Sequence, residues 1–348
     1  MSRNLLIIAQ MVDENDSHRA SFVDWLKEFS KKFDQVFVVT VAKGQYTLPS
    51  NVEVYSLGKE KGVSKLVQAL SFYKYLIRLV PRSEGLFAHA SPIFVIASWP
   101  VAFMYRKNII LWYLHRSLTT KLKLAERLCY KIVTANKGSL TLESSKIIET
   151  GHGINIERFN VPRDWAEKVK IKIISVGRIS PIKNFETIIE AARILKSNNQ
   201  EFDIQIIGQP VMKTDVVYQK HLEKLVLEYD LSSQIQFVGL VPYNKMVAHY
   251  READYYIGAL PKGGIDRAML EGMASGEIVF TSNKAFTPYL GDFDVIFEYN
   301  NPKDLADKII ALNVRSNEYK KNISNFMVES VSNHHRLENV ISRISSLL

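Results

Sequence analysis

IKIISVGRISPIKN, residues 171–184, passes from an apolar run through a glycine into a cationic turn. The run IKIISV is typical of a buried strand in a parallel sheet. Gly177 ends it, Arg178 follows, and Lys183 stands directly before a stretch near 184–197 with helical spacing. A strand that leads into a helix through such a turn predicts a βαβ unit.

The same alternation continues to the end of the chain. Apolar runs that predict strands lie at 171–177, 203–208, 235–240, 254–260, 277–282 and 294–299. Helical stretches separate them near 184–197, 214–229, 245–252, 265–275 and 302–312. Strands that alternate with helices indicate a parallel sheet covered on both faces. A last amphipathic helix is expected near 334–347, with Leu337, Val340, Ile341 and Ile344 on one face.

The first half has the same rhythm. Strands are predicted at 5–10, 36–41, 52–57, 86–90, 109–114 and 131–135. Among the helices is 65–80, on which Leu66, Leu70, Tyr73, Ile77 and Val80 share a face. A chain of 348 residues suits two α/β domains at about 150 residues each. We therefore predict domains at 1–160 and 161–330, with the boundary in the polar stretch 157–170, and a C-terminal helix at 331–348.

Composition narrows the class of protein. Cys129 is the single cysteine, which excludes an intramolecular disulfide framework and a multi-cysteine metal site. The start lacks the cleavage site of a signal peptide, so a cytoplasmic protein is expected. Residues 85–105 carry no formal charge, but two prolines and His89 interrupt them. We interpret this stretch as a buried strand and a buried helix, with Ser91-Pro92 as the helix start, rather than as a membrane span.

The net charge of +9 lies entirely in the first half. Residues 1–160 have 22 Lys and Arg against 13 Asp and Glu, whereas residues 161–348 have 23 of each. Within 101–137, eight basic residues face one acid, Glu126. Such a patch attracts an anionic membrane, an anionic lipid substrate or nucleic acid, and it is equally typical of a solvated helix face. No recognition helix or stacking platform supports nucleic acid, so weak association of the 106–131 region with anionic lipid is the expectation.

Ligands bind beyond the carboxyl ends of the strands in open parallel sheets, and three loops there suit a diphosphate. VGRISPIKN at 176–184 offers the bidentate fork of Arg178 and the compact charge of Lys183. IIGQP at 206–210 places Gly208 at a strand end. PKGGIDRAMLEGMASG at 261–276 is a glycine-rich turn that opens a helix, where backbone N–H groups can approach a phosphate. Taken singly, each is also an ordinary strand-to-helix turn.

Glu271 stands in the helix that follows the third loop. A carboxylate near a strand end could hold both hydroxyls of a ribose through paired hydrogen bonds. A solvent-facing glutamate on an amphipathic helix is the alternative. Asp292-Phe293-Asp294 spells the DxD of metal-dependent glycosyltransferases but falls between late elements, so we interpret it as coincidence and expect neither metal nor cofactor.

Taken together, these motifs resemble the retaining glycosyltransferase family 4, which has the GT-B fold of two Rossmann-like domains facing across a cleft. The resemblance rests on GRISPIKN, VGL, EADYYIGAL and LEGMASGEIVFTSN in the second half. It extends to LWYLHRS at 111–117, IVTANKGS at 132–139 and TGHGINIERF at 150–159. It implies that the C-terminal helix crosses back onto the first domain.

The resemblance also implies roles for residues. Arg178 and Lys183 match the pair that binds the donor's diphosphate, and Glu271 matches the glutamate that binds the ribose. His115 matches a histidine beside the transferred sugar, and Gly239 lies near the base. The remaining candidates on the donor side are Gly208, Gly264, Ile265, Asp266 and Arg267.

The chain departs from the family pattern at two places. Gly263 stands where the family usually has a second glutamate, and Asp266, three residues on, is either its substitute or a helix cap. The loop after the first strand reads MVDENDSHR instead of a glycine-rich sequence, and its His18 and Arg19 either face the acceptor or are solvated.

The resemblance thus implies a metal-independent, retaining transfer of a sugar from a nucleoside-diphosphate sugar to an acceptor hydroxyl. A glycan or a lipid-linked acceptor is expected, at the cytoplasmic side of a membrane. A sugar-nucleotide epimerase of the same fold and a catalytically degraded binding subunit are the alternatives. The base, the sugar, the acceptor and the oligomeric state are left open.

Overall fold

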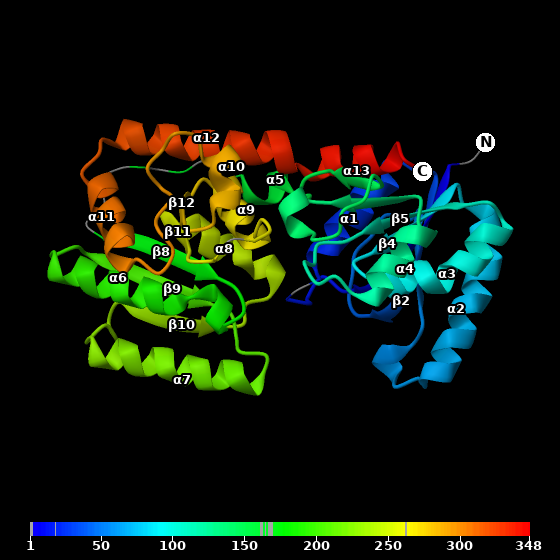
Figure 1. Ribbon diagram of the computed structural model, residues 1–348, viewed down its shortest axis with the longest axis horizontal. Helices are drawn as coiled ribbons and strands as arrows, with labels where there is room; N and C mark the ends of the chain where they lie inside the picture. Colours follow the sequence, from blue (N-terminus) through cyan, green and yellow to red (C-terminus); the bar gives the residue numbers. More distant parts are fainter. Residues whose placement is uncertain (1–2, 18, 161–162, 164, 166–169, 262) are drawn as a thin grey trace. The chain divides into compact units, whose positions relative to one another are not determined.

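The computed structural model describes residues 3–17, 19–160, 163, 165, 170–261 and 263–348. The chain divides into two compact units. Unit 1 comprises Met1–Asn155 with His335–Leu348, and unit 2 comprises Ile156–His334. Each unit has one parallel sheet with helices on its faces, as the alternation of strands and helices predicts (Figure 1).

The sheet of unit 1 has seven strands in the order β3-β2-β1-β4-β5-β6-β7. Its central strand β1 is buried on both faces, because Leu6 and Ile8 pack into one core and Leu5 and Ile7 into the other. The strands are β1 Asn4–Val12, β2 Gln35–Lys43, β3 Val52–Ser56, β4 Gly85–His89, β5 Asn108–Trp112, β6 Lys131–Thr134 and β7 Ile147–Glu149.

Helices cover both faces of this sheet. On one face lie α1 (Ser21–Ser30) and α13 (Leu337–Ser345), and the four apolar residues predicted to share a face of the C-terminal helix are buried there. On the other face lie α2 (Lys65–Leu79), α3 (Pro92–Met104) and α4 (Thr120–Leu128). The uncharged stretch therefore forms β4 and α3. No helix among the described residues is both long enough and apolar enough to span a bilayer.

Helix α2 contacts the core with a different face from the one that its periodicity highlights. Phe72, Leu76 and Leu79 are buried. Of the predicted stripe, Leu66, Leu70, Tyr73 and Ile77 face solvent, and only Val80, which follows the helix, is buried. A helix with two apolar faces can bury only one of them against a single sheet. The other face of α2 is left without a partner in the described part of the chain.

The sheet of unit 2 has five strands in the order β10-β9-β8-β11-β12. They are β8 Ile171–Val176, β9 Phe202–Ile207, β10 Ile235–Gly239, β11 Tyr255–Gly258 and β12 Ile278–Thr281. The sixth predicted strand, 294–299, is wrong: this segment makes only an isolated bridge from Ile296 to Thr281. It lies beside the last residue of β12, where the ladder is too short to form a strand.

The helices that accompany the strands of unit 2 are α5 Ile156–Phe159, α6 Phe185–Ser197, α7 Lys213–Glu228, α8 Tyr243–Glu252, α9 Arg267–Ala274, α10 Thr287–Leu290 and α11 Pro302–Asn313. The five helices predicted between the strands of unit 2 are present, and the short helices α5 and α10 were not predicted. Helix α12, Asn317–His335, was not predicted. Its Ile323, Met327 and Val331 are buried at a spacing of four residues, and most of the other residues of the helix are polar.

Each sheet has one place where the strand order reverses direction. In unit 1 it lies between β1 and β4, and in unit 2 between β8 and β11. The loops that leave two such strands diverge to opposite faces of the sheet, and the crevice between them is where open parallel sheets bind ligands.

Candidate functional site

Glycines end three neighbouring strands of unit 2. Gly177, Gly208 and Gly239 stand at the carboxyl ends of β8, β9 and β10, with φ of 150°, 145° and 82°. The Gly177 N–H donates to the Ile207 carbonyl at 2.9 Å, and the Gly208 N–H donates to the Gly239 carbonyl at 2.9 Å. A Cβ on Gly208 would lie 1.9 Å from the Gly177 carbonyl oxygen. These strand ends thus form a backbone surface without side chains, which a ligand can approach closely.

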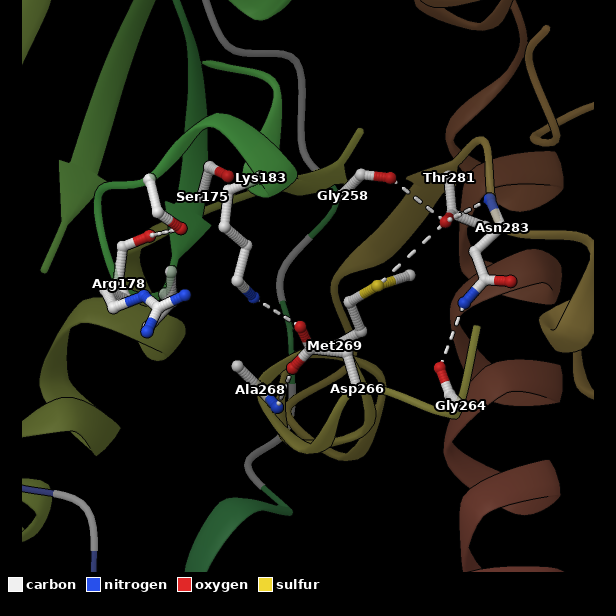
Figure 2. Close-up of polar contacts among 12 residues, drawn as sticks. Ser175, Arg178, Lys183, Gly258, Gly264, Asp266, Ala268, Met269, Thr281 and Asn283 are labelled. Carbon is white, nitrogen blue, oxygen red and sulfur yellow. Dashed lines mark hydrogen bonds and ion pairs between the residues drawn. The ribbon is translucent and has the colours of Figure 1, made fainter. Parts of the chain in front are cut away.

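Lys183 folds back over this surface. A Cβ on Gly177 would lie 2.6 Å from the Lys183 Nζ, so the absence of a side chain makes room for the ammonium group. The Lys183 Nζ lies 2.5 Å from Asp266 Oδ2, and both side chains are largely buried (Figure 2). Lys183 comes from the loop after β8 and Asp266 from the loop after β11. This ion pair therefore spans the point where the strand order of unit 2 reverses.

Asp266 has a second task, because it is the N-cap of α9. Its Oδ1 accepts from the Ala268 N–H at 2.9 Å while its Oδ2 pairs with Lys183. One oxygen of this carboxylate, Oδ1, therefore acts as the helix cap that the sequence left open as an alternative. The other oxygen is directed at the cationic turn, so Asp266 can act on Lys183 without giving up its cap.

The glycine-rich turn is held from the adjacent strand. Asn283 follows β12 and donates its Nδ2 to the Gly264 carbonyl at 3.0 Å. Thr281, the last residue of β12, donates its hydroxyl to the Gly258 carbonyl and accepts from the Asn283 N–H (Figure 2). The sequence reasoning missed Thr281 and Asn283. The feature that could have identified them is the polar TSN at 281–283, which ends an apolar run.

Arg178 has most of its donors available. Its side chain is 42% exposed, and its Nε lies 3.7 Å from Asp215 Oδ2. Asp215 is buried at the start of α7, where its Oδ2 also accepts from the Met212 N–H at 3.1 Å. A buried carboxylate tied to backbone N–H groups thus lies beside the base of a guanidinium whose side chain is partly exposed. Asp215 was also missed, since nothing near it in the sequence marks it.

Glu271 is buried rather than solvent-facing. Its Oε1 pairs with the Arg267 Nε at 2.8 Å, and the Tyr250 hydroxyl donates to Oε2 at 3.3 Å. Burial raises the pKa of Glu271, and the charge of Arg267 opposes that rise. Of the other donor-side candidates, Ile265 is buried, whereas Gly263 and Gly264 are partly exposed.

Unit 1 has a small cavity where its strand order reverses. Its volume is about 160 Å³, and its lining includes Gln10 after the middle of β1 and His89 and Ala90 at the end of β4. The His89 ring stacks on Phe22 with ring centroids 4.1 Å apart. The exposed Arg19 also lines the cavity and donates to Gln10 Oε1 at 3.1 Å. His89 was not among the predicted site residues, although it lies one residue before the end of the strand predicted at 86–90.

Of the other two residues predicted for unit 1, the structure describes one. His18 lies outside the described residues. His115 is exposed in the loop after β5, where its ring meets Tyr113 edge-on at 5.5 Å between centroids. Among the described residues, no group of three or more His, Cys, Asp or Glu side chains is placed to hold a metal ion.

Comparison with known proteins identifies residues 158–326 as a match to the family model described as "Glycosyl transferases group 1". The amylovoran biosynthesis glycosyltransferase AmsK of Erwinia amylovora is 30% identical over 160 residues, which cover 44% of this chain and 37% of AmsK. The chain thus matches less than half the length of this curated relative. Residues 158–326, which match the family model, include every donor-side residue described above.

Solved structures share the fold over the whole chain. HepE of Anabaena, solved with UDP, superposes with a TM-score of 0.76 at 14% identity, covering 99% of this chain and 98% of HepE. Sucrose-phosphate synthase of Thermosynechococcus elongatus superposes with a TM-score of 0.77 at 12% identity, with the same coverage. The fold is GT-B, built from two parallel-sheet α/β units.

Proposed function

We propose that this protein is a glycosyltransferase that moves a sugar from a nucleoside-diphosphate sugar to an acceptor hydroxyl. The observation that carries the proposal is the arrangement at the strand reversal of unit 2. There, three glycine strand ends lie beside Arg178 and Lys183, within the region that matches the glycosyltransferase model. A diphosphate needs close backbone approach and positive charge, and this arrangement supplies both.

The chemistry follows from where charge develops. The bond between the sugar's anomeric carbon and the diphosphate oxygen breaks, and negative charge grows on the leaving oxygen. Arg178 and Lys183 stabilise that charge most strongly in the transition state. The leaving oxygen takes the proton of the acceptor hydroxyl, whose oxygen forms the new bond on the same face of the sugar. No separate general base and no metal ion are then required, and the configuration is retained.

The remaining donor contacts fit the same pose. Glu271 accepts from the ribose hydroxyls, because a carboxylate has more acceptor positions than Arg267 and Tyr250 occupy. Gly208, Gly239, Gly264 and Ile265 offer backbone groups to the nucleotide. His115 serves the transferred sugar. Asp266 holds the Lys183 ammonium in place and takes the part of the glutamate that Gly263 replaces.

The substrate class is proposed from relatives. HepE has been solved with UDP and with UDP-glucose, which makes a UDP-hexose the first donor to test. AmsK is named for the biosynthesis of a polysaccharide, amylovoran, which points to a glycan or a lipid-linked glycan acceptor. We place the reaction at the cytoplasmic face of a membrane, where such acceptors are assembled.

A donor panel followed by product analysis tests the proposal. Calorimetric titration with UDP, GDP, ADP and CDP should single out one base, and Lys183→Ala should weaken that binding. The corresponding UDP- or GDP-sugars are then incubated with and without simple glycoside acceptors. Release of the nucleoside diphosphate that rises with acceptor supports a transferase. Conversion of the donor's sugar to an epimer without acceptor would indicate an epimerase. Binding of the nucleotide without turnover would indicate a binding subunit.

A further inference from the structure

The outer face of α2 in unit 1 is apolar and exposed. Leu66 is 71% exposed, Leu70 64% and Ile77 55%, with Tyr73 beside them at 40%. These four residues recur at helical spacing, so they form one continuous stripe along the helix. The core contacts of α2 come from the opposite face, through Phe72, Leu76 and Leu79. A stripe of this length is not needed to hold the helix on its sheet.

Basic side chains border this stripe. Lys65, Lys74 and Arg78 are exposed on α2, and residues 61–83 contain five Lys and Arg but no Asp or Glu. At about 100° per residue, Lys74 and Arg78 fall along one side of the stripe, whereas Lys65, exposed at the first residue of α2, projects on the core side. We call the stripe and the two cations beside it the α2 face: Leu66, Leu70, Tyr73 and Ile77 with Lys74 and Arg78.

The neighbouring helices α3 and α4 also have exposed apolar or basic side chains. Helix α3 packs against both α2 and α4, on the same side of the sheet (Figure 1). It contains no charged residue and ends in Phe103 and Met104, which are 68% and 61% exposed. Helix α4 contributes exposed cations at Lys121, Lys123 and Arg127. The cations of α4, within the basic 106–131 region, and the α2 face therefore belong to one helical layer.

We propose that the α2 face docks on an anionic lipid bilayer, with α2 lying in the plane of the interface. Its leucines and isoleucine enter the acyl boundary, and Lys74 and Arg78 contact the anionic headgroups. Charge favours this occupant over a second copy of the chain, because pairing two α2 faces would set like charges against each other. A bilayer accepts both the apolar stripe and the cations. This proposal is independent of the donor chemistry of unit 2.

Vesicle co-sedimentation of the full chain, without donor or acceptor, tests this docking. The vesicles are phosphatidylcholine alone or phosphatidylcholine with phosphatidylglycerol, each at low and at high salt. Wild-type protein should pellet with the anionic vesicles and dissociate as salt rises. Leu70→Ser with Ile77→Ser should lower the partition coefficient about tenfold or more. Lys74→Gln with Arg78→Gln should lower it by about fivefold for each cation, on anionic vesicles only.

A matched control comes from unit 2. Val217 and Leu227 on α7 are 69% and 70% exposed, and Val217→Ser with Leu227→Ser should leave pelleting unchanged. Circular dichroism should show all these variants folded, since the altered side chains face solvent.

Three results would overturn the proposal. The first is equal pelleting by wild type and Leu70→Ser with Ile77→Ser. The second is a loss of pelleting with Lys121→Gln, Lys123→Gln and Arg127→Gln that the α2 variants do not share, which would place docking on α4. The third is a concentration-dependent dimer in light scattering that Leu70→Ser with Ile77→Ser abolishes, together with no binding to vesicles, which would identify a second copy as the occupant.

Discussion

The strand reversals of the two units have the same topology but opposite chemistry. In unit 2 the loops after β8 and β11 bring together glycine strand ends, two cations and their carboxylate partners. In unit 1 the loops after β1 and β4 enclose a cavity of about 160 Å³ that is lined by Phe22 and His89 as well as by Arg19. One reversal thus combines bare backbone with two cations, whereas the other combines a stacked aromatic pair, Phe22 and His89, with one exposed cation, Arg19.

This difference separates two binding tasks. Bare backbone and fixed cations suit a diphosphate, which is small, rigid and highly charged. Stacked rings and a few polar groups suit an apolar or sugar-like surface. The same sheet geometry supplies both positions, and the side chains alone distinguish them. We therefore propose that unit 2 binds the donor and unit 1 the acceptor, and four predictions test that division.

Removing either cation of unit 2 should have the largest effect. We expect Arg178→Ala or Lys183→Ala to reduce turnover by about 10²–10³, because each removes an electrostatic stabiliser of the leaving group. Initial rates at saturating donor measure this. Lys196→Ala, which breaks an exposed pair with Asp230 in the same unit, is the control and should keep its rate. Wild-type rates in both variants would remove the diphosphate assignment.

The glycine strand ends should differ in how well they tolerate a side chain. Gly208→Ala should cost about 2–4 kcal/mol of unfolding free energy, because its Cβ meets the Gly177 carbonyl and its φ is unfavourable. Gly239→Ala has a positive φ but open space around its Cβ, so about 1 kcal/mol is expected. Urea denaturation compares the two. Equal losses would mean that the strand ends can move apart and do not form a fixed surface.

Asp266 should matter more for turnover than for stability. In Asp266→Asn the amide still caps α9, because asparagine caps about as well as aspartate, but the charge that holds Lys183 is lost. We expect turnover to fall about 10- to 100-fold in protein that is still folded at the assay temperature, although the melting temperature falls because the largely buried Lys183 loses its partner. Asp266→Ala, which also loses the cap, should be less stable by about a further 1 kcal/mol. A change confined to stability would leave Asp266 as a helix cap alone.

The smallest effect is expected in unit 1. Arg19→Ala should raise the acceptor KM about five- to tenfold, the loss of one charge-assisted hydrogen bond, and leave donor affinity unchanged. Steady-state kinetics and donor titration measure the two quantities separately. Arg3→Ala breaks an exposed pair with Glu84 and serves as the matched control. A change in donor affinity without a change in acceptor KM would contradict the division between the units.

Local sequence predicted much of the fold, because its signals are local. Residues 5–9 are apolar throughout because β1 is covered on both faces, and the face of α13 is evident because its residues recur at helical spacing. The incorrect and missed secondary-structure predictions have local causes too. Segment 294–299 resembles a strand but has only one bridge to pair with, and α12 hides three buried apolar residues in a polar helix.

The sequence alone was enough to establish two parallel sheets and to select Arg178, Lys183 and the strand-end glycines, since residue type and position after an apolar run require no knowledge of distant contacts. Only the folded chain shows that Lys183 pairs with Asp266, 83 residues away, and that Asp215 holds Arg178. It also shows that α2 turns its longer apolar stripe outward. These features depend on strand order and on which helix face meets the sheet, and both follow from the long-range packing of the whole unit rather than from any local pattern.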